Sequence, residues 1–151
     1  AYFALALKPV DGLLIEWYAD AETGDELDLL FHGLIGYQND IFKGGVLFSM
    51  EAGESERKMA SVFGSAKLID NLKVAARFDK NLDLNSKGGG IAYTPHSKEA
   101  SANTVIFGLD WSPAKNVYVL PNVVASFYDE PEKGEKPDLD LQPRLTLYYK
   151  F

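Results

Sequence analysis

The sequence predicts an all-β chain in which antiparallel strands follow one another up and down within a single domain. Segments of about ten residues alternate between apolar and polar side chains, and polar segments separate them. The clearest alternation closes the chain, where one face would carry Leu145, Leu147, Tyr149 and Phe151. A period of two places these side chains on one side of a strand and the intervening residues on the other side.

Nine segments carry this pattern. Their predicted ranges are 1–8, 12–20, 26–38, 42–52, 58–69, 71–81, 102–112, 116–129 and 140–151. Many of them approach the length of about nine to eleven residues with which a tilted strand crosses a bilayer. The segment 51–60 contains helix-forming residues, but Gly53 interrupts it and it has no apolar stripe. It is therefore predicted to be a loop with strand ends on either side, not a helix.

The connections are predicted to alternate in length. Short turns fall at 9–12, 38–40, 70–71 and 112–116, and longer polar loops fall at 21–25, 52–57, 81–101 and 129–138. Short turns at one end of the strands and longer loops at the other end are typical of outer-membrane β-barrels.

The two faces of the predicted strands differ in polarity. In segment 71–81 the alternation separates Leu72, Val74, Ala76 and Phe78 from Lys73, Ala75, Arg77 and Asp79. In segment 26–38 the polar face includes two exceptions, Leu30 and Leu34. A water-soluble barrel would bury the apolar face, whereas a membrane barrel would turn it toward lipid and line a wet lumen with the polar face. The alternation alone does not separate these two cases.

Aromatic residues near the predicted strand ends favour the membrane case, because such residues collect at the two membrane–water interfaces. The predicted girdle contains Trp17, Tyr37, Trp111 and Phe127, and other aromatic residues near strand ends are Phe42, Phe78, Tyr149 and Phe151.

The composition excludes several kinds of site. The chain of 151 residues has no cysteine, so it can form neither a disulfide nor a Cys-ligated metal site. Its two histidines are too few for a multi-His metal site, and its net charge of -7 argues against a nucleic-acid partner. No apolar run of about 18 residues predicts a transmembrane helix. Because the chain has neither an initiator Met nor a signal peptide, we expect a mature form or a fragment.

Four segments of the carboxyl-terminal half carry a family resemblance. DNLKVAARFD (70–79), GLDWSPAKNV (108–117), LPN (120–122) and RLTLYYKF (144–151) resemble porin-like outer-membrane proteins of Gram-negative bacteria. The resemblance implies an antiparallel up-and-down transmembrane β-barrel in the outer membrane that passes small hydrophilic solutes passively and has no cofactor. It implies that Leu145, Leu147, Tyr149 and Phe151 form the signal that the barrel-assembly machinery recognises. Outer-membrane lipid, lipopolysaccharide and the other subunits of a homotrimer are the further implied partners.

Bacterial barrels of one chain have an even number of strands, whereas nine are predicted here. We therefore expect the chain to be the carboxyl-terminal part of a larger even-stranded barrel. Pro121 lies inside a predicted strand, and because proline cannot donate a hydrogen bond to the ladder, a local bulge is expected there.

The polar faces supply the candidate pore-lining residues. They are Glu16, Asp28, His32, Lys67, Lys73, Arg77, Asp79, Asp110, Asn122 and Arg144. Acidic and basic side chains that face each other across a lumen would create a transverse field that sorts solutes. The alternative is a solvated strand face with no selectivity.

Three other functions compete with the channel. A soluble barrel of the lipocalin or fatty-acid-binding type would hold an apolar ligand inside its apolar face. A non-conducting structural barrel would have the same strand pattern as a channel. A hydrolase would need His32 close to Ser61 or Ser65 and an acid, but no Gly-x-Ser-x-Gly motif supports it, so we predict no catalytic residues.

Two loop features have simple explanations. Gly88-Gly89-Gly90 lacks the Gly-Lys-Ser/Thr ending of a phosphate-binding loop, so a flexible loop is expected. Acidic residues of the loops could hold divalent cations beside lipopolysaccharide, but ordinary loop solubility explains them better. They include Glu22, Asp25, Glu26, Glu51, Glu54, Glu56, Glu130, Glu132 and Glu135.

Overall fold

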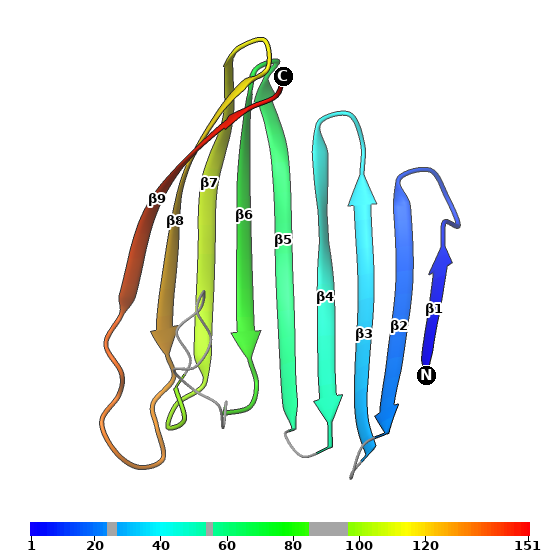
Figure 1. Cartoon of the computed structure of the whole chain (residues 1–151), viewed down its shortest axis with the longest axis vertical. Coiled ribbons are helices and arrows are strands. Elements are labelled where there is room, and N and C mark those ends of the chain that lie inside the picture. The colour runs from blue at the N-terminus through cyan, green and yellow to red at the C-terminus, as the bar shows by residue number, and fades with distance from the viewer. Residues whose placement is uncertain (24–26, 54–55, 85–96) are drawn as a thin grey trace.

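The computed structural model describes residues 1–23, 27–53, 56–84 and 97–151, and these form one antiparallel sheet (Figure 1). Its nine strands are β1 (Tyr2–Leu7), β2 (Leu13–Thr23), β3 (Leu27–Gln38), β4 (Phe42–Ala52), β5 (Arg57–Ile69), β6 (Leu72–Asn81), β7 (Ala102–Ala114), β8 (Val117–Tyr128) and β9 (Asp140–Tyr149). Each strand pairs with the next along the chain, so the prediction of an all-β, up-and-down fold is confirmed. Within the segment 51–60, residues 51–52 end β4 and residues 57–60 begin β5, and its described residues form no helix.

The turns and loops lie at opposite ends of the sheet (Figure 1). We call the end with the connections 8–12, 39–41, 70–71 and 115–116 the turn end, and the opposite end the loop end. The carboxyl terminus lies at the turn end and the amino terminus at the loop end. Only the connections 82–101 and 129–139 are long. The predicted alternation in length therefore holds for the carboxyl-terminal half alone.

Two local devices close the tight connections. In the turn 39–41, the side-chain oxygen of Asn39 accepts hydrogen bonds from the backbone N–H groups of Ile41 and Phe42, at 3.0 and 2.7 Å. Asn116 adopts a left-handed conformation with φ of 64° between β7 and β8, a conformation that asparagine tolerates better than most residues. Both turns are thus specified by local side-chain chemistry.

The nine strands do not close into a barrel. Among the described residues, β1 and β9 make no contact with each other, and each is an edge of the sheet. Both strands run from the loop end toward the turn end, so a direct ladder between them would be parallel (Figure 1). The observed fold is an open, curved sheet.

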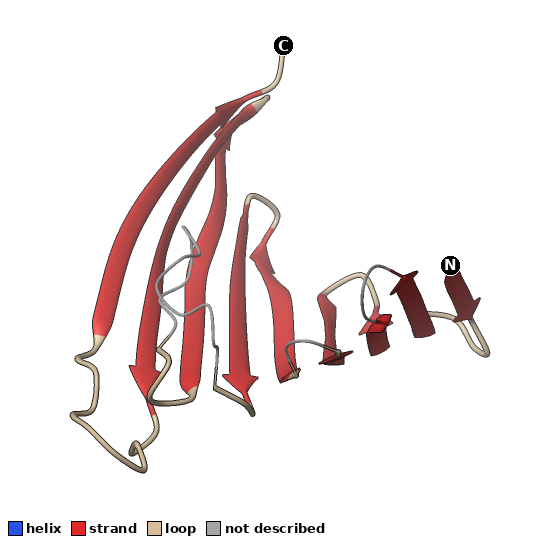
Figure 2. Ribbon diagram, turned by 60° about the horizontal axis from the view of Figure 1, so that its bottom comes forward, coloured by secondary structure: helices blue, strands red, loops and turns tan. Residues whose placement is uncertain are grey.

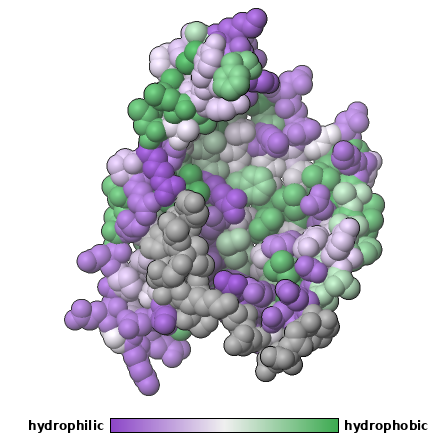
Figure 3. Space-filling view, in the orientation of Figure 1, coloured by the Kyte–Doolittle hydropathy of each residue, from purple (hydrophilic) through white to green (hydrophobic). Residues whose placement is uncertain are grey.

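The curvature gives the sheet a convex and a concave face. Figure 2 shows β1–β4 turned almost end-on while β7–β9 rise along the picture, and Figure 3 looks onto the hollowed side. Side chains on a concave face converge and shield one another. Leu34, Leu47 and Ile106 on this face are partly shielded, whereas Ile35, Val46 and Val62 on the other face are about half exposed.

The predicted bulge at Pro121 is wrong. Gly108 lies opposite Asn122 and Trp111 lies opposite Val119, and these two pairs keep the same offset, so no residue is inserted at Pro121. Pro121 itself lies opposite Leu145 in the ladder with β9. The irregularity of the β7–β8 ladder falls instead between Trp111 and Ala114, next to the turn. A strand can thus accept a missing N–H without changing its register.

Candidate functional site

Pairing between strands shows which residues share a face. Directly opposed residues lie on the same face, so a chain of such pairs traces a row across the sheet. One row consists of Glu16, Leu34, Leu47, Ser61, Asp79, Thr104, Ser126 and Asp140. The next row consists of Leu7, Ile15, Ile35, Val46, Val62, Phe78, Val105, Ala125 and Leu141. The first row lies on the concave face and is mostly polar, and the second is wholly apolar and lies on the convex face.

Burial in these two rows is the reverse of that in a water-soluble protein. On the concave face Ser61, Thr104 and Ser126 are only 5, 4 and 1% exposed. On the convex face Ile35, Val46 and Val62 are 51, 50 and 51% exposed. The sheet therefore hides hydroxyl groups and presents a broad apolar surface outward.

All ten candidate pore-lining residues lie on the concave face. The pairings place there Glu16, Asp28, His32, Lys67, Lys73, Arg77, Asp79, Asp110, Asn122 and Arg144. The period-two pattern is sufficient to assign each of them to a face. It does not show which of them meet across strands.

The charges of the concave face separate along the strands. Asp20, Asp28 and Glu51 lie near the loop end of β2, β3 and β4. Lys43, Lys67 and Lys73 lie near the turn end of β4, β5 and β6. Three residues depart from this division: Arg57 forms an ion pair with Glu51 at the loop end, Glu16 lies near the turn end of β2, and Asp110 lies near the turn end of β7. Within this open sheet the separation of charge runs along the strands, and the transverse field between facing walls of a lumen stays a prediction.

A compact network joins three of the concave side chains in β5 and β6. The hydroxyl of Ser61 donates a hydrogen bond to Asp79 Oδ1, and Arg77 Nε donates to both carboxylate oxygens of Asp79 at 2.8 and 2.9 Å. Arg77 Nη2 also donates to the Ser61 hydroxyl at 3.4 Å. The carboxylate of Asp79 thus accepts hydrogen bonds from a charged donor and a neutral donor, which compensate for its removal from water.

A second polar group lies between β7 and β8. The hydroxyls of Thr104 and Ser126 share a hydrogen bond of 3.2 Å and are both buried. Neither residue stands out in the sequence, because an uncharged hydroxyl in an alternating strand gives no sign that it will pair. Their position on the polar face of segments 102–112 and 116–129 is the only available signal.

A third polar cluster lies on the convex face, at its loop end. Lys80 Nζ donates to Asp129 Oδ2 at 2.9 Å and to Asn103 Oδ1 at 3.3 Å, and Asn103 Nδ2 donates to Asp129 Oδ1 at 2.8 Å. These hydrogen bonds, first that from Lys80 and then that from Asn103, lower the pKa of Asp129. The cluster lies where the apolar surface of β6–β8 ends, and no feature of the sequence predicts it.

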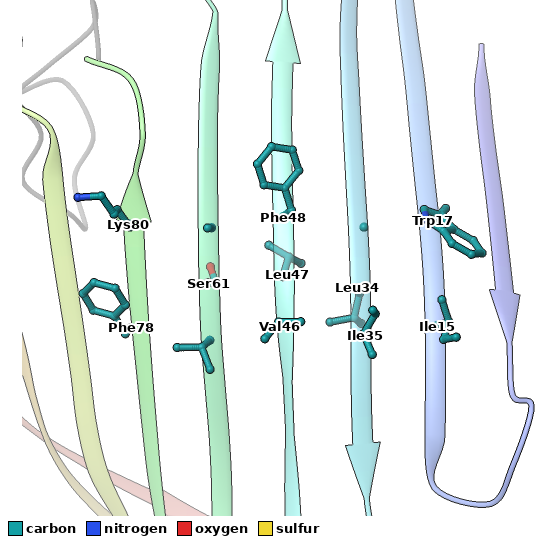
Figure 4. Close-up of a pocket in the computed structure, with 13 residues that line it drawn as sticks. Ile15, Trp17, Leu34, Ile35, Val46, Leu47, Phe48, Ser61, Phe78 and Lys80 are labelled. Carbon is teal, nitrogen blue, oxygen red and sulfur yellow. The ribbon is translucent and has the colours of Figure 1, made fainter.

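The convex face carries the four residues of the predicted aromatic girdle, Trp17, Tyr37, Trp111 and Phe127. Tyr37 and Trp111 lie toward the turn end, and Phe127 lies at the loop end of β8. Trp17 does not lie at a strand end as expected, because β2 extends to Thr23 and leaves it in mid-strand opposite Gly33. Trp17, Phe48 and Phe78 border a shallow apolar depression of about 610 Å³ (Figure 4).

The apolar surface runs obliquely across the strands. At the turn end its last aromatic residues are Tyr37 in β3 and Tyr149 in β9. The row of paired residues that starts at Tyr37 reaches β9 at Pro143. The last aromatic residue of β9, Tyr149, lies six residues further toward the turn end, so the border shifts by six residues over the six steps from β3 to β9. The shift of one residue, about 3.3 Å, for each strand spacing of about 4.8 Å corresponds to an angle of about 35°.

The other border of the apolar surface has the same slope. At the loop end Leu29 in β3 and Leu141 in β9 are the last convex apolar side chains described within their strands. The row through Leu141 meets β3 at Ile35, again six residues away (35 − 29 = 6). In β3 the surface extends from Leu29 to Tyr37, about 26 Å along the strand and about 22 Å perpendicular to the border. The two borders thus enclose a slanted band of constant width, which we call the apolar band.

The residues considered for catalysis are not assembled. His32 lies beside Tyr18, with ring centroids 5.8 Å apart, and opposite Ser49 in the ladder. The side-chain partners of Ser61 are Asp79 and Arg77, and Ser65 lies opposite Lys43 and Ala75. Gly88-Gly89-Gly90 and the loop acids Asp25, Glu26 and Glu54 lie outside the described residues.

The described part of the chain contains no group of three or more His, Asp or Glu side chains that could hold a metal ion. No helix in the described residues is long and apolar enough to cross a membrane. The sequence matches no protein-family model, and neither curated proteins nor solved structures gave a significant match.

Proposed function

We propose that this chain forms the wall of a porin-like channel in the outer membrane of a Gram-negative bacterium, through which small hydrophilic solutes diffuse passively. The observation that carries this proposal is the reversed burial of the two faces. Hydroxyl and charged side chains lie on the concave face, and an apolar band covers the convex face. Lipid outside and water inside would solvate both faces, whereas water on both sides would leave the apolar band unfavourably exposed.

The geometry of the apolar band supports the same proposal. Strands of membrane β-barrels are tilted by about 35–45°, and their apolar band is about 25 Å tall. The slope of about 35° and the height of about 22 Å derived from the pairing agree with both values. A band that crosses the strands obliquely but keeps its width would become level with a membrane once the strands tilt.

The soluble ligand-binding barrel fits less well. Such a barrel encloses its ligand with the apolar side chains of its inner face. Here the apolar side chains lie on the convex face, and the depression between Trp17, Phe48 and Phe78 opens outward (Figure 4). An apolar ligand bound there would remain largely exposed.

The proposal assigns the predicted partners to different surfaces. Outer-membrane lipid and lipopolysaccharide would contact the apolar band, and small polar solutes would contact the concave face. The barrel-assembly machinery would recognise β9, where Leu145, Leu147 and Tyr149 point outward beside an unpaired strand edge. The homotrimer and the origin of the strands that would pair with β1 and β9 remain predictions.

The first experiment is expression with a secretion signal in a Gram-negative host, followed by fractionation and gel mobility with and without boiling. We expect sheet-rich protein in the outer-membrane fraction that needs detergent and whose mobility shifts on boiling. Planar-bilayer recording would then show stepwise conductance. A monodisperse protein that needs no detergent would overturn the proposal, and a membrane-folded protein without conductance would contradict its channel part.

A further inference from the structure

Two lysines face each other directly on the concave face, and this inference rests on the proposed channel. Lys67 of β5 lies opposite Lys73 of β6. Like charges at directly opposed positions destabilise a strand pair. The repulsion between the two ammonium groups therefore lowers the stability of the β5–β6 pair, and nearby acids or a bound anion would offset it.

Nearby acids offset this repulsion only in part. Lys67 Nζ lies 2.7 Å from Asp70 Oδ1, and this hydrogen bond lowers the pKa of Asp70. The side chain of Asp70 is 98% exposed, however, so the ion pair is weak and a competing anion can displace it. Asp110 lies opposite Lys73 on β7, but Lys73 forms no ion pair within the described residues.

The floor beside the two lysines is made of small side chains. In the next concave row toward the loop end, two residues along each strand, Ser65, Ala75 and Gly108 follow one another on β5, β6 and β7. A Cβ atom on Gly108 would lie only 2.9 Å from the Asn122 Cβ, so this position is restricted to glycine unless Asn122 moves. The small residues leave space on the concave side, over which the long lysine side chains can bend.

Further cations lie at both ends of this row. Lys43 of β4 lies opposite Ser65, and Arg144 of β9 lies opposite Asn122. Neither side chain forms an ion pair within the part of the chain that the structure describes. Arg77, two residues nearer the loop end than Ala75, forms an ion pair with Asp79 instead. The cations that surround the small-residue floor therefore outnumber the acids beside them, Asp110 and Asp70.

We propose that Lys67 and Lys73, with Lys43, form an anion site at the turn end of the concave face that attracts small solutes bearing a carboxylate or phosphate group. Ammonium groups bind such groups as point charges, and a concave wall concentrates their field. The acids Asp20, Asp28 and Glu51 at the loop end give the other end of the wall the opposite sign. Anions would thus be favoured at the turn end of the channel.

The test compares two variants with equal loss of charge. The first, Lys67→Gln with Lys73→Gln, removes the opposed lysines. The matched control, Lys115→Gln with Lys133→Gln, removes two exposed lysines from the turn 115–116 and the loop 129–139. The reversal potential is measured in planar bilayers across a tenfold KCl gradient, and inorganic phosphate is then added as a blocker of the chloride current.

We expect the ratio of chloride to potassium permeability to fall by roughly threefold in the first variant and to stay unchanged in the control. The phosphate concentration that halves the chloride current should rise by about tenfold in the first variant alone. Equal selectivity and equal block in both variants would overturn the anion site and leave the channel proposal standing. Heat-modifiable mobility shows that each variant has folded.

A protein without conductance contradicts the channel proposal but leaves a direct test of the anion site. Inorganic phosphate is then titrated into the detergent-folded protein, and the NMR signals of the lysine ammonium groups are followed. Saturable shifts at Lys67 and Lys73 that the double variant abolishes support the site. A titration curve that is identical in the wild type and the double variant overturns it.

Discussion

The convex and the concave face of this sheet are built on the same nine strands, yet their side chains have opposite environments. Ile35 and Leu34 are neighbours in β3, but the first is half exposed on an apolar surface and the second is partly shielded among polar rows. Burial alone therefore does not identify the solvent of a face. The chemistry of the whole row is needed, because each face is continuous across all nine strands.

The largest difference between the two faces is expected when a charge is placed on each of them at adjacent positions. Ala75 and Ala76 of β6 are both exposed and have the same size, but Ala75 is concave and Ala76 is convex. We expect Ala76→Arg to destabilise the membrane-folded protein by about 2–4 kcal/mol, because the charge would enter the bilayer midplane. Ala75→Arg should destabilise the protein by well below half of that free energy, because its charge would face water. Urea titration of protein folded into lipid vesicles measures both.

Equal costs for the two arginines would show that both faces meet the same solvent. That outcome would contradict the membrane proposal even if the protein were found in a membrane fraction.

A smaller effect is expected from the buried hydroxyl pair of the concave face. Ser126→Ala leaves the Thr104 hydroxyl buried without its partner, which should cost about 1–3 kcal/mol. Replacing both residues, as Thr104→Val with Ser126→Ala, should recover part of this loss. The exposed Thr146 on the same face is the control, and Thr146→Val should change the unfolding midpoint little. If the double variant lost as much stability as Thr104→Val and Ser126→Ala lose when each is measured alone and the losses are added, the hydroxyls would not act as a pair.

The smallest effect concerns the polar cluster that ends the apolar band. The hydrogen bond from Lys80 lowers the pKa of Asp129, so Asp129 should titrate below its ordinary range. Its contribution to stability is then present above the unfolded-state pKa and lost as the pH falls through the lowered folded-state pKa. Lys80→Gln should raise the pKa of Asp129 in an NMR titration, whereas Lys133→Gln should not. An unchanged pKa in Lys80→Gln would show that the contact is absent in solution.

The local residue pattern predicted the strands well and some details within them wrongly. The sequence correctly located the nine strands and their faces, because a period of two and the turn residues are local properties. It misplaced the expected bulge, since Pro121 lacks only one donor and its neighbours keep the register. It placed Trp17 too close to a strand end, because the polar residues after Trp17 continue β2 instead of ending it.

The all-β architecture and the polar or apolar character of each strand face thus follow from the local residue pattern. Only the tertiary structure decided which residues meet across strands, such as Lys67 with Lys73 and Ser61 with Asp79. It also decided which face is concave and the slope of the apolar band. The physical reason is that alternation depends on neighbours within one strand, whereas register and curvature depend on hydrogen bonds between segments whose sequences carry no common signal.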